Sequence, residues 1–157
     1  MGERITSKWT SSLTEAFGDT PQIRKAIAGE ELWESFARKA YDEVINHKSD
    51  RSKQIAGADF TIKKSNWRFP VTVDVKTNLN NRTFFVENIS NGWLRSKNKQ
   101  TIRIVHLDIV EGWVIQYDRI MMIKYLDSKN ITTPLVKLSV FDPDINVFAR
   151  RYRISLT

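Results

Sequence analysis

Hydrophobic residues recur every three or four positions in two N-terminal segments, which is the spacing of one face of an α-helix. The first segment, 6–17, contains Trp9, Leu13, Ala16 and Phe17 and ends at Gly18. The second, 28–46, contains a broader stripe made of Trp33, Phe36, Ala37, Ala40, Tyr41 and Val44. The pattern predicts a short helix followed by a long one, with Pro21 as a further helix start between them.

After a polar loop at 47–54, hydrophobic residues alternate with polar ones, as they do in half-buried β-strands. The alternation predicts strands at 58–63, 69–76, 83–89, 101–108 and 112–116. It also predicts closing strands or extended segments at 135–141 and 147–154. The polar segment 64–68 predicts a hairpin turn, so the first two strands should pair antiparallel. Asp118 is positioned to cap a helix that runs to Leu126. This order predicts an α/β (α+β) fold, with a central mixed β-sheet flanked by helices.

Length and composition limit the class of protein. The chain has 157 residues, the usual size of one domain, and no change of composition divides 1–157. With 41% hydrophobic and 27% charged residues, it can bury a core and should be soluble and globular. No apolar run could cross a bilayer, and the N-terminus lacks the apolar stretch of a signal peptide. We therefore expect an intracellular protein with no membrane partner.

The side chains present also limit the chemistry. Cysteine is absent, which excludes disulfides, thiolate zinc sites and cysteine nucleophiles, and two histidines are too few for a multi-histidine metal site. Any metal must therefore be held mainly by carboxylates. Of the two histidines, His106 alternates with apolar neighbours, which is typical of a strand residue facing solvent or a satisfied partner rather than of a catalytic base.

The charge of the chain favours a polyanionic partner. Lys and Arg number 25 against 18 Asp and Glu, a formal net charge of +7. Such an excess attracts phosphate polyanions through counterion release, which makes nucleic acid the natural partner. Solubility alone can also account for a basic chain, so the charge supports this interpretation without establishing it.

One strand combines an acid and a base on the same face. In the segment 69–76, Asp74 and Lys76 point to one side while the valines between them point to the other. Asp59 lies on the preceding strand, across the predicted hairpin, and could approach Asp74 if a cation lay between them. Hard divalent ions such as Mg²⁺ or Mn²⁺ take carboxylate and carbonyl oxygens, and the Val75 carbonyl could add a ligand. A lysine beside such an ion suits phosphodiester hydrolysis, although an isolated Asp-Xaa-Lys more often lies on a solvated face.

These residues resemble the PD-(D/E)XK nuclease superfamily, in which an Asp precedes an Asp/Glu-Xaa-Lys strand. The matching segments are GADFTIK with Asp59 and VDVKT with Asp74 and Lys76, and Ala58 stands where the motif has proline. The family often has a further Glu on the preceding helix. Gly29 followed by Glu30 is similar to that element, and a helical wheel places Glu30, rather than Glu31, beside the apolar stripe.

The resemblance covers roughly 29–87, and the Asn91-Gly92-Trp93 segment is similar to a Gly-Trp element in several small members. It implies a metal-dependent DNA endonuclease of the homing, restriction or junction-resolving type, in the cytoplasm of a bacterium or phage-infected host. It also implies Asp59, Asp74, Lys76 and Glu30 as catalytic residues, with Asp59, Asp74, Val75 and Glu30 as ligands of Mg²⁺ (or Mn²⁺). No small-molecule cofactor is expected. A homodimer is expected because one site cuts one strand.

Two basic clusters are candidates for contact with DNA phosphates. The first comprises residues near the hairpin and in a downstream loop, namely Lys63, Lys64, Arg68, Arg95, Lys97 and Lys99. The second is the ARRYR segment with Arg150, Arg151 and Arg153, and the sequence does not decide between them. Two other functions stay open: a catalytically inactive nuclease-fold protein that binds nucleic acid, and an RNA-directed nuclease.

Overall fold

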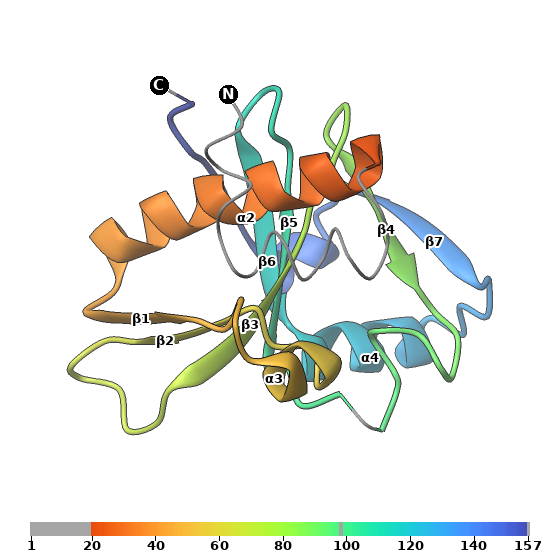
Figure 1. Cartoon of the computed structure of the whole chain (residues 1–157). Coiled ribbons are helices and arrows are strands. Elements are labelled where there is room, and N and C mark those ends of the chain that lie inside the picture. Colours follow the sequence, from red (N-terminus) through yellow and green to blue (C-terminus); the bar gives the residue numbers. More distant parts are fainter. Residues whose placement is uncertain (1–19, 98, 157) are drawn as a thin grey trace.

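The central sheet of the computed structural model contains six strands in the order β1-β2-β3-β5-β6-β8, and β4 and β7 form a separate two-stranded sheet. The structure describes residues 20–97 and 99–156. In chain order the elements are α2 (Pro21–Ala40), β1 (Glu43–Asn46), α3 (Arg51–Ile55), β2 (Phe60–Lys63), β3 (Val71–Lys76), β4 (Thr83–Glu87), β5 (Arg103–Leu107), β6 (Trp113–Asp118), α4 (Arg119–Ser128), β7 (Leu135–Ser139), η2 (Ile145–Val147) and β8 (Arg150–Arg153) (Figure 1).

The sheet is mixed because β3 and β5 run parallel while its other neighbouring strands run antiparallel. The β2–β3 hairpin pairs Phe60 with Val73 and Ile62 with Val71. The predicted antiparallel pairing of these two strands is confirmed, and so is the α/β (α+β) fold with a central mixed sheet flanked by helices.

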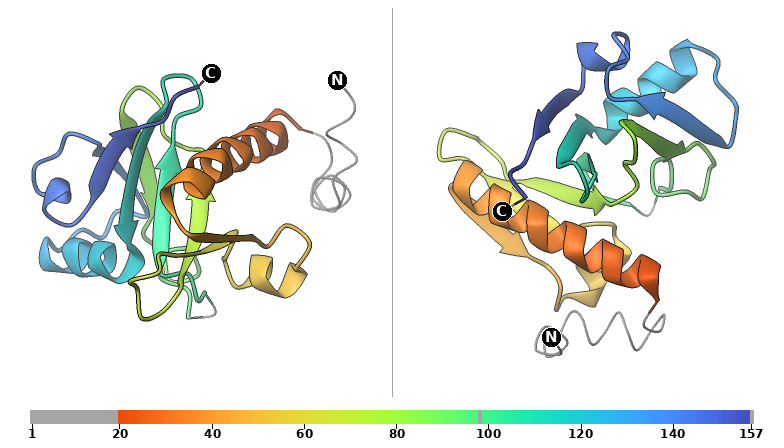
Figure 2. Two further views of the ribbon diagram at one scale, coloured as in Figure 1. Left: turned by 90° about the vertical axis from the view of Figure 1, so that its left-hand side faces the viewer. Right: turned by 90° about the horizontal axis from the view of Figure 1, so that it is seen from above.

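Two hydrophobic clusters form the core, one on each face of the six-stranded sheet. On one face, Trp33 and Ala37 of α2 pack against Val73, Val75 and Val105. On the other face, α4 and the β4–β7 sheet cover the side chains of β5 and β6 (Figure 2). Strand β3 is therefore buried on both faces at Val73, Asp74 and Val75.

The long helix differs from the prediction at both ends. It begins at Pro21, because the Thr20 side chain accepts the backbone N–H of Ile23 at 3.2 Å and proline fits the first helical turn. It ends at Ala40, and Glu43–Asn46 is the edge strand β1 instead of the last helical turn. The β-branched pair Val44 and Ile45 favours a strand, and pairing with β2 stabilises it there.

Three other local predictions need correction. The polar loop at 47–54 contains most of a short helix, α3, whose N-cap Asp50 accepts the backbone N–H of Lys53 at 3.1 Å. Strand β4 pairs with β7 outside the central sheet. Asp118 occupies the N-cap position of α4, but its side chain makes no capping hydrogen bond and lies 3.6 Å from Arg103 Nε.

The predicted helix at 6–17 lies outside the described residues, and the single domain 1–157 stays a prediction. Within the part of the chain that is described, no helix combines the length and the apolar character needed to cross a membrane.

Candidate active site

Asp59 immediately precedes β2, and two hydrogen bonds to the backbone of β3 hold its main chain and its side chain. Its backbone N–H donates to the Val73 carbonyl at 2.8 Å, and its Oδ2 accepts the Val75 N–H at 2.8 Å. The pKa of Asp59 is raised well above its ordinary value by burial, and then by the charge of Asp74 and a side-chain hydrogen bond shared with Asp74. The two carboxyl groups predicted to meet across the hairpin are thus in contact.

Lys76 completes a buried acid–base pair on β3. Its Nζ lies 3.1 Å from Asp74 Oδ2 and 5.0 Å from the centre of the Trp93 ring. Burial on its own lowers the pKa of Lys76, but the negative charges of Asp74 and Asp59 outweigh it, so the pKa is raised on balance. The lysine therefore stays an ammonium ion at neutral pH, held over an aromatic face.

Glu30 reaches the same cluster from α2. Its pKa is raised well above the ordinary value by burial and by the charges of Asp59 and Asp74, while Lys76 acts in the opposite direction. Glu31, the alternative weighed from the sequence, is exposed. The structure therefore brings together the four residues predicted to be catalytic, from α2, the start of β2 and the end of β3.

Gly29 allows this approach. A Cβ placed on Gly29 would overlap Thr77 Cγ2, which immediately follows β3. Any side chain at position 29 would therefore force Thr77 to move, so glycine suits the place where α2 crosses the end of the strand, next to Glu30.

The donor set matches the preference of a hard divalent ion. Asp59, Asp74 and Glu30 supply carboxylate oxygens, and the raised pKa values of Asp59 and Glu30 reflect negative charges that a cation would neutralise. The N–H and C=O of one residue in a strand point to the same edge, so the Val75 carbonyl faces the edge where its N–H meets Asp59. Within residues 20–97 and 99–156, however, no group of three or more His, Cys, Asp or Glu side chains is arranged to hold a metal ion.

His106 is fully buried on β5, where it is the register partner of Lys76 on the neighbouring strand β3. Its Nδ1 lies 2.6 Å from Asn78 Oδ1 and its Nε2 lies 2.6 Å from the Tyr117 hydroxyl. Because an amide oxygen only accepts, Nδ1 donates to Asn78, and Nε2 accepts from Tyr117. Burial and the nearby ammonium of Lys76 lower the pKa of His106 well below its ordinary value. His106 is therefore a neutral, satisfied core residue.

Two residues around Lys76 were not predicted as site residues. Glu87, at the end of β4, adds to the negative charge that raises the pKa of Lys76, and its Oε1 accepts the Trp93 backbone N–H at 3.2 Å. Glu87 therefore fixes the loop that places Trp93 over the ammonium group. The Gly-Trp element was a signal for Trp93, whereas no local pattern marked Glu87.

Three of the predicted DNA-binding residues lie away from this cluster. Lys63, Lys64 and Arg68 lie toward the β2–β3 turn, which at about 3.3 Å per residue is roughly 16 Å along the strand from Asp59. Lys64 lies over the Tyr41 ring and Arg68 over the Phe69 ring.

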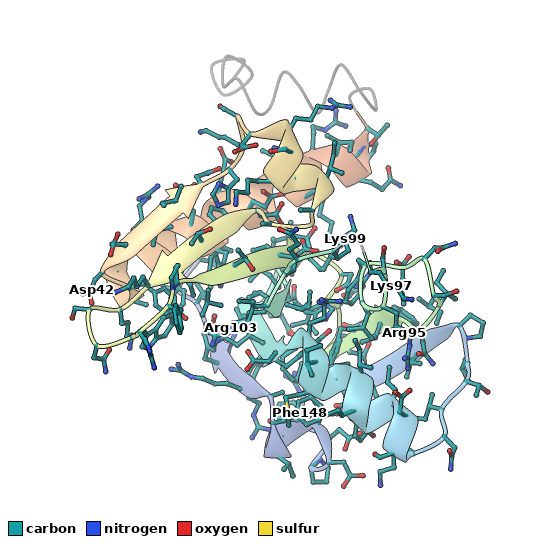
Figure 3. All side chains as sticks on the ribbon, turned by 90° about the horizontal axis from the view of Figure 1, so that it is seen from below. Asp42, Arg95, Lys97, Lys99, Arg103 and Phe148 are labelled. Atoms are coloured by element: carbon teal, nitrogen blue, oxygen red, sulfur yellow. The ribbon has the colours of Figure 1, made fainter. Side chains whose placement is uncertain are left out.

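The downstream loop borders the cluster, because Trp93 lies over Lys76 and Lys99 lies against Gly57, two residues before Asp59. Its cations Arg95, Lys97 and Lys99 lie near one another (Figure 3), and two of them are held to the fold. Arg95 donates to Asn88 at 2.7 Å and to Asp127 at 2.8 Å, and Lys99 Nζ donates to the Ile55 carbonyl at 2.9 Å. Lys97 is exposed. Arg95 and Lys99 thus have structural contacts that a phosphate would have to replace.

Comparisons of the chain with protein-family models, curated proteins and solved structures found no match.

Proposed function

We propose that the chain is a metal-dependent endodeoxyribonuclease of the PD-(D/E)XK type, which hydrolyses phosphodiester bonds. The observation that supports this best is the meeting of Asp59, Asp74, Lys76 and Glu30, which come from three separate elements and share one buried electrostatic cluster. Asp74 is buried, and Asp59, Glu30 and Lys76 are half-buried. Gathering three acids around one lysine there costs stability, because charged groups lose part of their hydration. Such an arrangement is typical of a functional site rather than of a structural ion pair.

In the proposed site, Asp59, Asp74, Glu30 and the Val75 carbonyl would hold Mg²⁺ or Mn²⁺. The ion would supply positive charge that stabilises the phosphate oxygens and makes a water molecule more acidic. Lys76 keeps its proton at Nζ, so it can orient the attacking water and stabilise the charge that develops on the phosphate. The face of the Trp93 ring attracts this ammonium group and helps to hold it in place.

The same proposal includes the homodimer and the cellular location. Cleavage of both strands by a protein with one such site requires two copies, each with its own site, related by symmetry. The molar mass of the protein in solution, measured by light scattering, tests this directly. The proposed location, which follows from the family resemblance, is the cytoplasm of a bacterium or a phage-infected host.

A second candidate is a nucleic-acid-binding protein that keeps the fold without the metal chemistry. One observation favours it: the described residues contain no group of three potential ligands already arranged for a metal. An RNA-directed nuclease would use the same site and differ only in substrate.

Purified protein incubated with supercoiled plasmid and with a branched DNA junction tests the proposal, in Mg²⁺, in Mn²⁺ and in EDTA. We expect cleavage with either metal and none in EDTA. Asp74→Ala should lose both metal binding and cleavage, whereas Lys124→Ala, on the exposed surface of α4, should cut normally. Tight binding without cleavage under any metal would support the second candidate, and cleavage of RNA alone would support the third.

A further inference from the structure

The edge strand β8 carries its arginines in an ordered arrangement with aromatic rings. Arg151 and Arg153, two residues apart and thus on one face, lie over Phe141 at 4.7 Å and over Trp113 at 5.1 Å. The two rings meet edge to face at 5.4 Å, and Phe141 is 43% exposed. Tyr152, between the arginines, packs on the opposite face against Phe36 of α2. The strand ends near the C-terminus at the sheet edge (Figure 2).

A third arginine joins them from a strained turn. Asn81 and Arg82 both have positive φ, 52° and 63°, between Asn80 and Thr83, which exchange two backbone hydrogen bonds. This is the conformation of a two-residue hairpin loop, whose second position favours glycine. Arg82 occupies that position, and its guanidinium lies 6.0 Å from the centre of the Phe141 ring. An arginine in a left-handed backbone conformation that favours glycine suggests that its side chain has a function.

We call these five residues the arginine–aromatic surface: Arg82, Trp113, Phe141, Arg151 and Arg153. Its positive charge is largely uncompensated. Glu111 Oε1 lies 3.9 Å from Arg82 Nε, at the outer limit of an ion pair. Within residues 20–97 and 99–156, no carboxylate lies within salt-bridge distance of Arg151 or Arg153. Arg151 and Arg153 are held over the rings by these cation–π contacts and by hydrogen bonds to the Val140 and Glu111 carbonyls, at 3.4 Å and 2.8 Å. Of the three guanidinium groups, Arg82 is the one with an acidic partner among the described residues.

We propose that the arginine–aromatic surface binds the phosphate backbone of the nucleic-acid strand that is cleaved at Asp59, Asp74 and Lys76. The inference rests on the proposed nuclease function and deepens it by assigning the contact that holds the substrate. A planar guanidinium matches a phosphate in a bidentate manner, and stacking on a ring fixes its orientation before binding. Contacts of this kind recognise the backbone and do not read base edges, so the binding is independent of sequence.

The distance to the catalytic cluster is compatible with one strand. Arg82 follows Lys76 by six positions, and an extended chain advances at most about 3.5 Å per residue, so their Cα atoms are no more than about 21 Å apart. Phosphates of one strand in a duplex are spaced by about 3.4 Å along the axis, so the span covers about six of them. A strand cut beside Lys76 could therefore reach the surface within one turn of a duplex.

Binding of labelled single-stranded and duplex DNA, measured by fluorescence anisotropy in EDTA, tests the proposal without cleavage. The test variant combines Arg82→Gly, Arg151→Gln and Arg153→Gln. The matched control removes three exposed cations from the α4–β7 side of the molecule: Lys124→Gln, Lys129→Gln and Lys137→Gln. Each lost phosphate contact lowers the salt slope of binding by about 0.7 for single strands and about 0.9 for duplex DNA. We expect the slope to fall by about 2 to 3 and the affinity to fall at least about tenfold near physiological salt, with a much smaller change in the control.

The single variant Arg82→Gly separates a binding role from a structural one. Glycine suits the turn, so the free energy of unfolding should stay the same or rise while DNA affinity falls. Equal losses of affinity in the test and control variants would overturn the proposal, because net charge alone would then explain them. Polyglutamate that competes as well as DNA would also overturn it, in favour of an acidic protein.

The same measurements distinguish this proposal from the nuclease proposal. If the wild-type protein does not cut under any metal but loses DNA affinity with the three arginines, the surface is supported as a binding site and the nuclease proposal fails. If metal-dependent cleavage is found and the arginine variant binds and cuts normally, the nuclease proposal stands and this inference is wrong.

Discussion

Replacement of Gly29 by alanine should damage the protein although alanine is the better helix former. In an open helix, the change from glycine to alanine stabilises by about 1 kcal/mol. Here the added Cβ would overlap Thr77 Cγ2, with Thr77 Cβ at 3.2 Å and Ile109 Cγ2 at 3.6 Å. Overpacking of this kind costs about 1–3 kcal/mol, which offsets the gain, so we expect a net loss of roughly 0–2 kcal/mol in the free energy of unfolding.

The loss should extend to activity because the same contact lies next to Glu30. A displacement of about 1 Å in a catalytic group can lower the rate about 100-fold. Urea unfolding and DNA cleavage are therefore measured for Gly29→Ala beside Ser35→Ala, an exposed position on the same helix. Addition of Thr77→Ala removes the overlapping methyl group and should recover part of both losses. A Gly29→Ala protein that is more stable by about 1 kcal/mol and cuts normally would refute the close approach of α2 to β3.

Three further changes probe the residues around the site. Asp59 and Glu30 have raised pKa values in the folded state, so the folded protein binds more protons, and the metal-free protein should lose stability as pH rises above the ordinary carboxyl range. Unfolding of Asp59→Asn at pH 5 and pH 8 should show a weaker pH dependence, and an unchanged dependence would contradict this. Trp93→Leu removes a cation–π contact worth about 0.5–2 kcal/mol and should lower kcat more than DNA affinity, whereas equal losses would indicate a general packing defect. Arg95→Ala removes the contacts of Arg95 with Asn88 and Asp127, so the free energy of unfolding should fall by about 1 kcal/mol while DNA affinity is retained. A large loss of DNA affinity would instead show that Arg95 contacts DNA.

Local patterns predicted the elements of the site better than the elements of the periphery. The alternation in VTVDVK placed Asp74 and Lys76 on one face, because the two-residue period of a strand leaves no other choice. The helical wheel likewise placed Glu30 beside the apolar stripe. The hairpin between β2 and β3 was evident from its polar turn, so the approach of Asp59 could be expected before its register was known.

The remaining features depend on contacts between distant parts of the chain. Val44 continued the helical stripe although its β-branched side chain favours a strand, and the pairing of Val44 with Ile62 of β2 decides for the strand. Pairing of β4 with β7 is also decided by tertiary packing. The basic clusters could not be sorted from the sequence, because Arg95 is anchored by Asp127, 32 residues away, and Arg151 acquires Arg82 as a neighbour through Phe141.

Single-turnover cleavage of a labelled DNA by Lys76→Ala, with protein in excess and Mg²⁺ present, tests the central claim most directly. Saturating protein removes any difference in binding, so the rate reports the cleavage step alone. Loss of a group that stabilises charge in the transition state should lower this rate by about 100- to 1,000-fold relative to the wild type, with DNA affinity retained. A Lys76→Ala rate equal to that of an actively cutting wild type would contradict the assignment of the site.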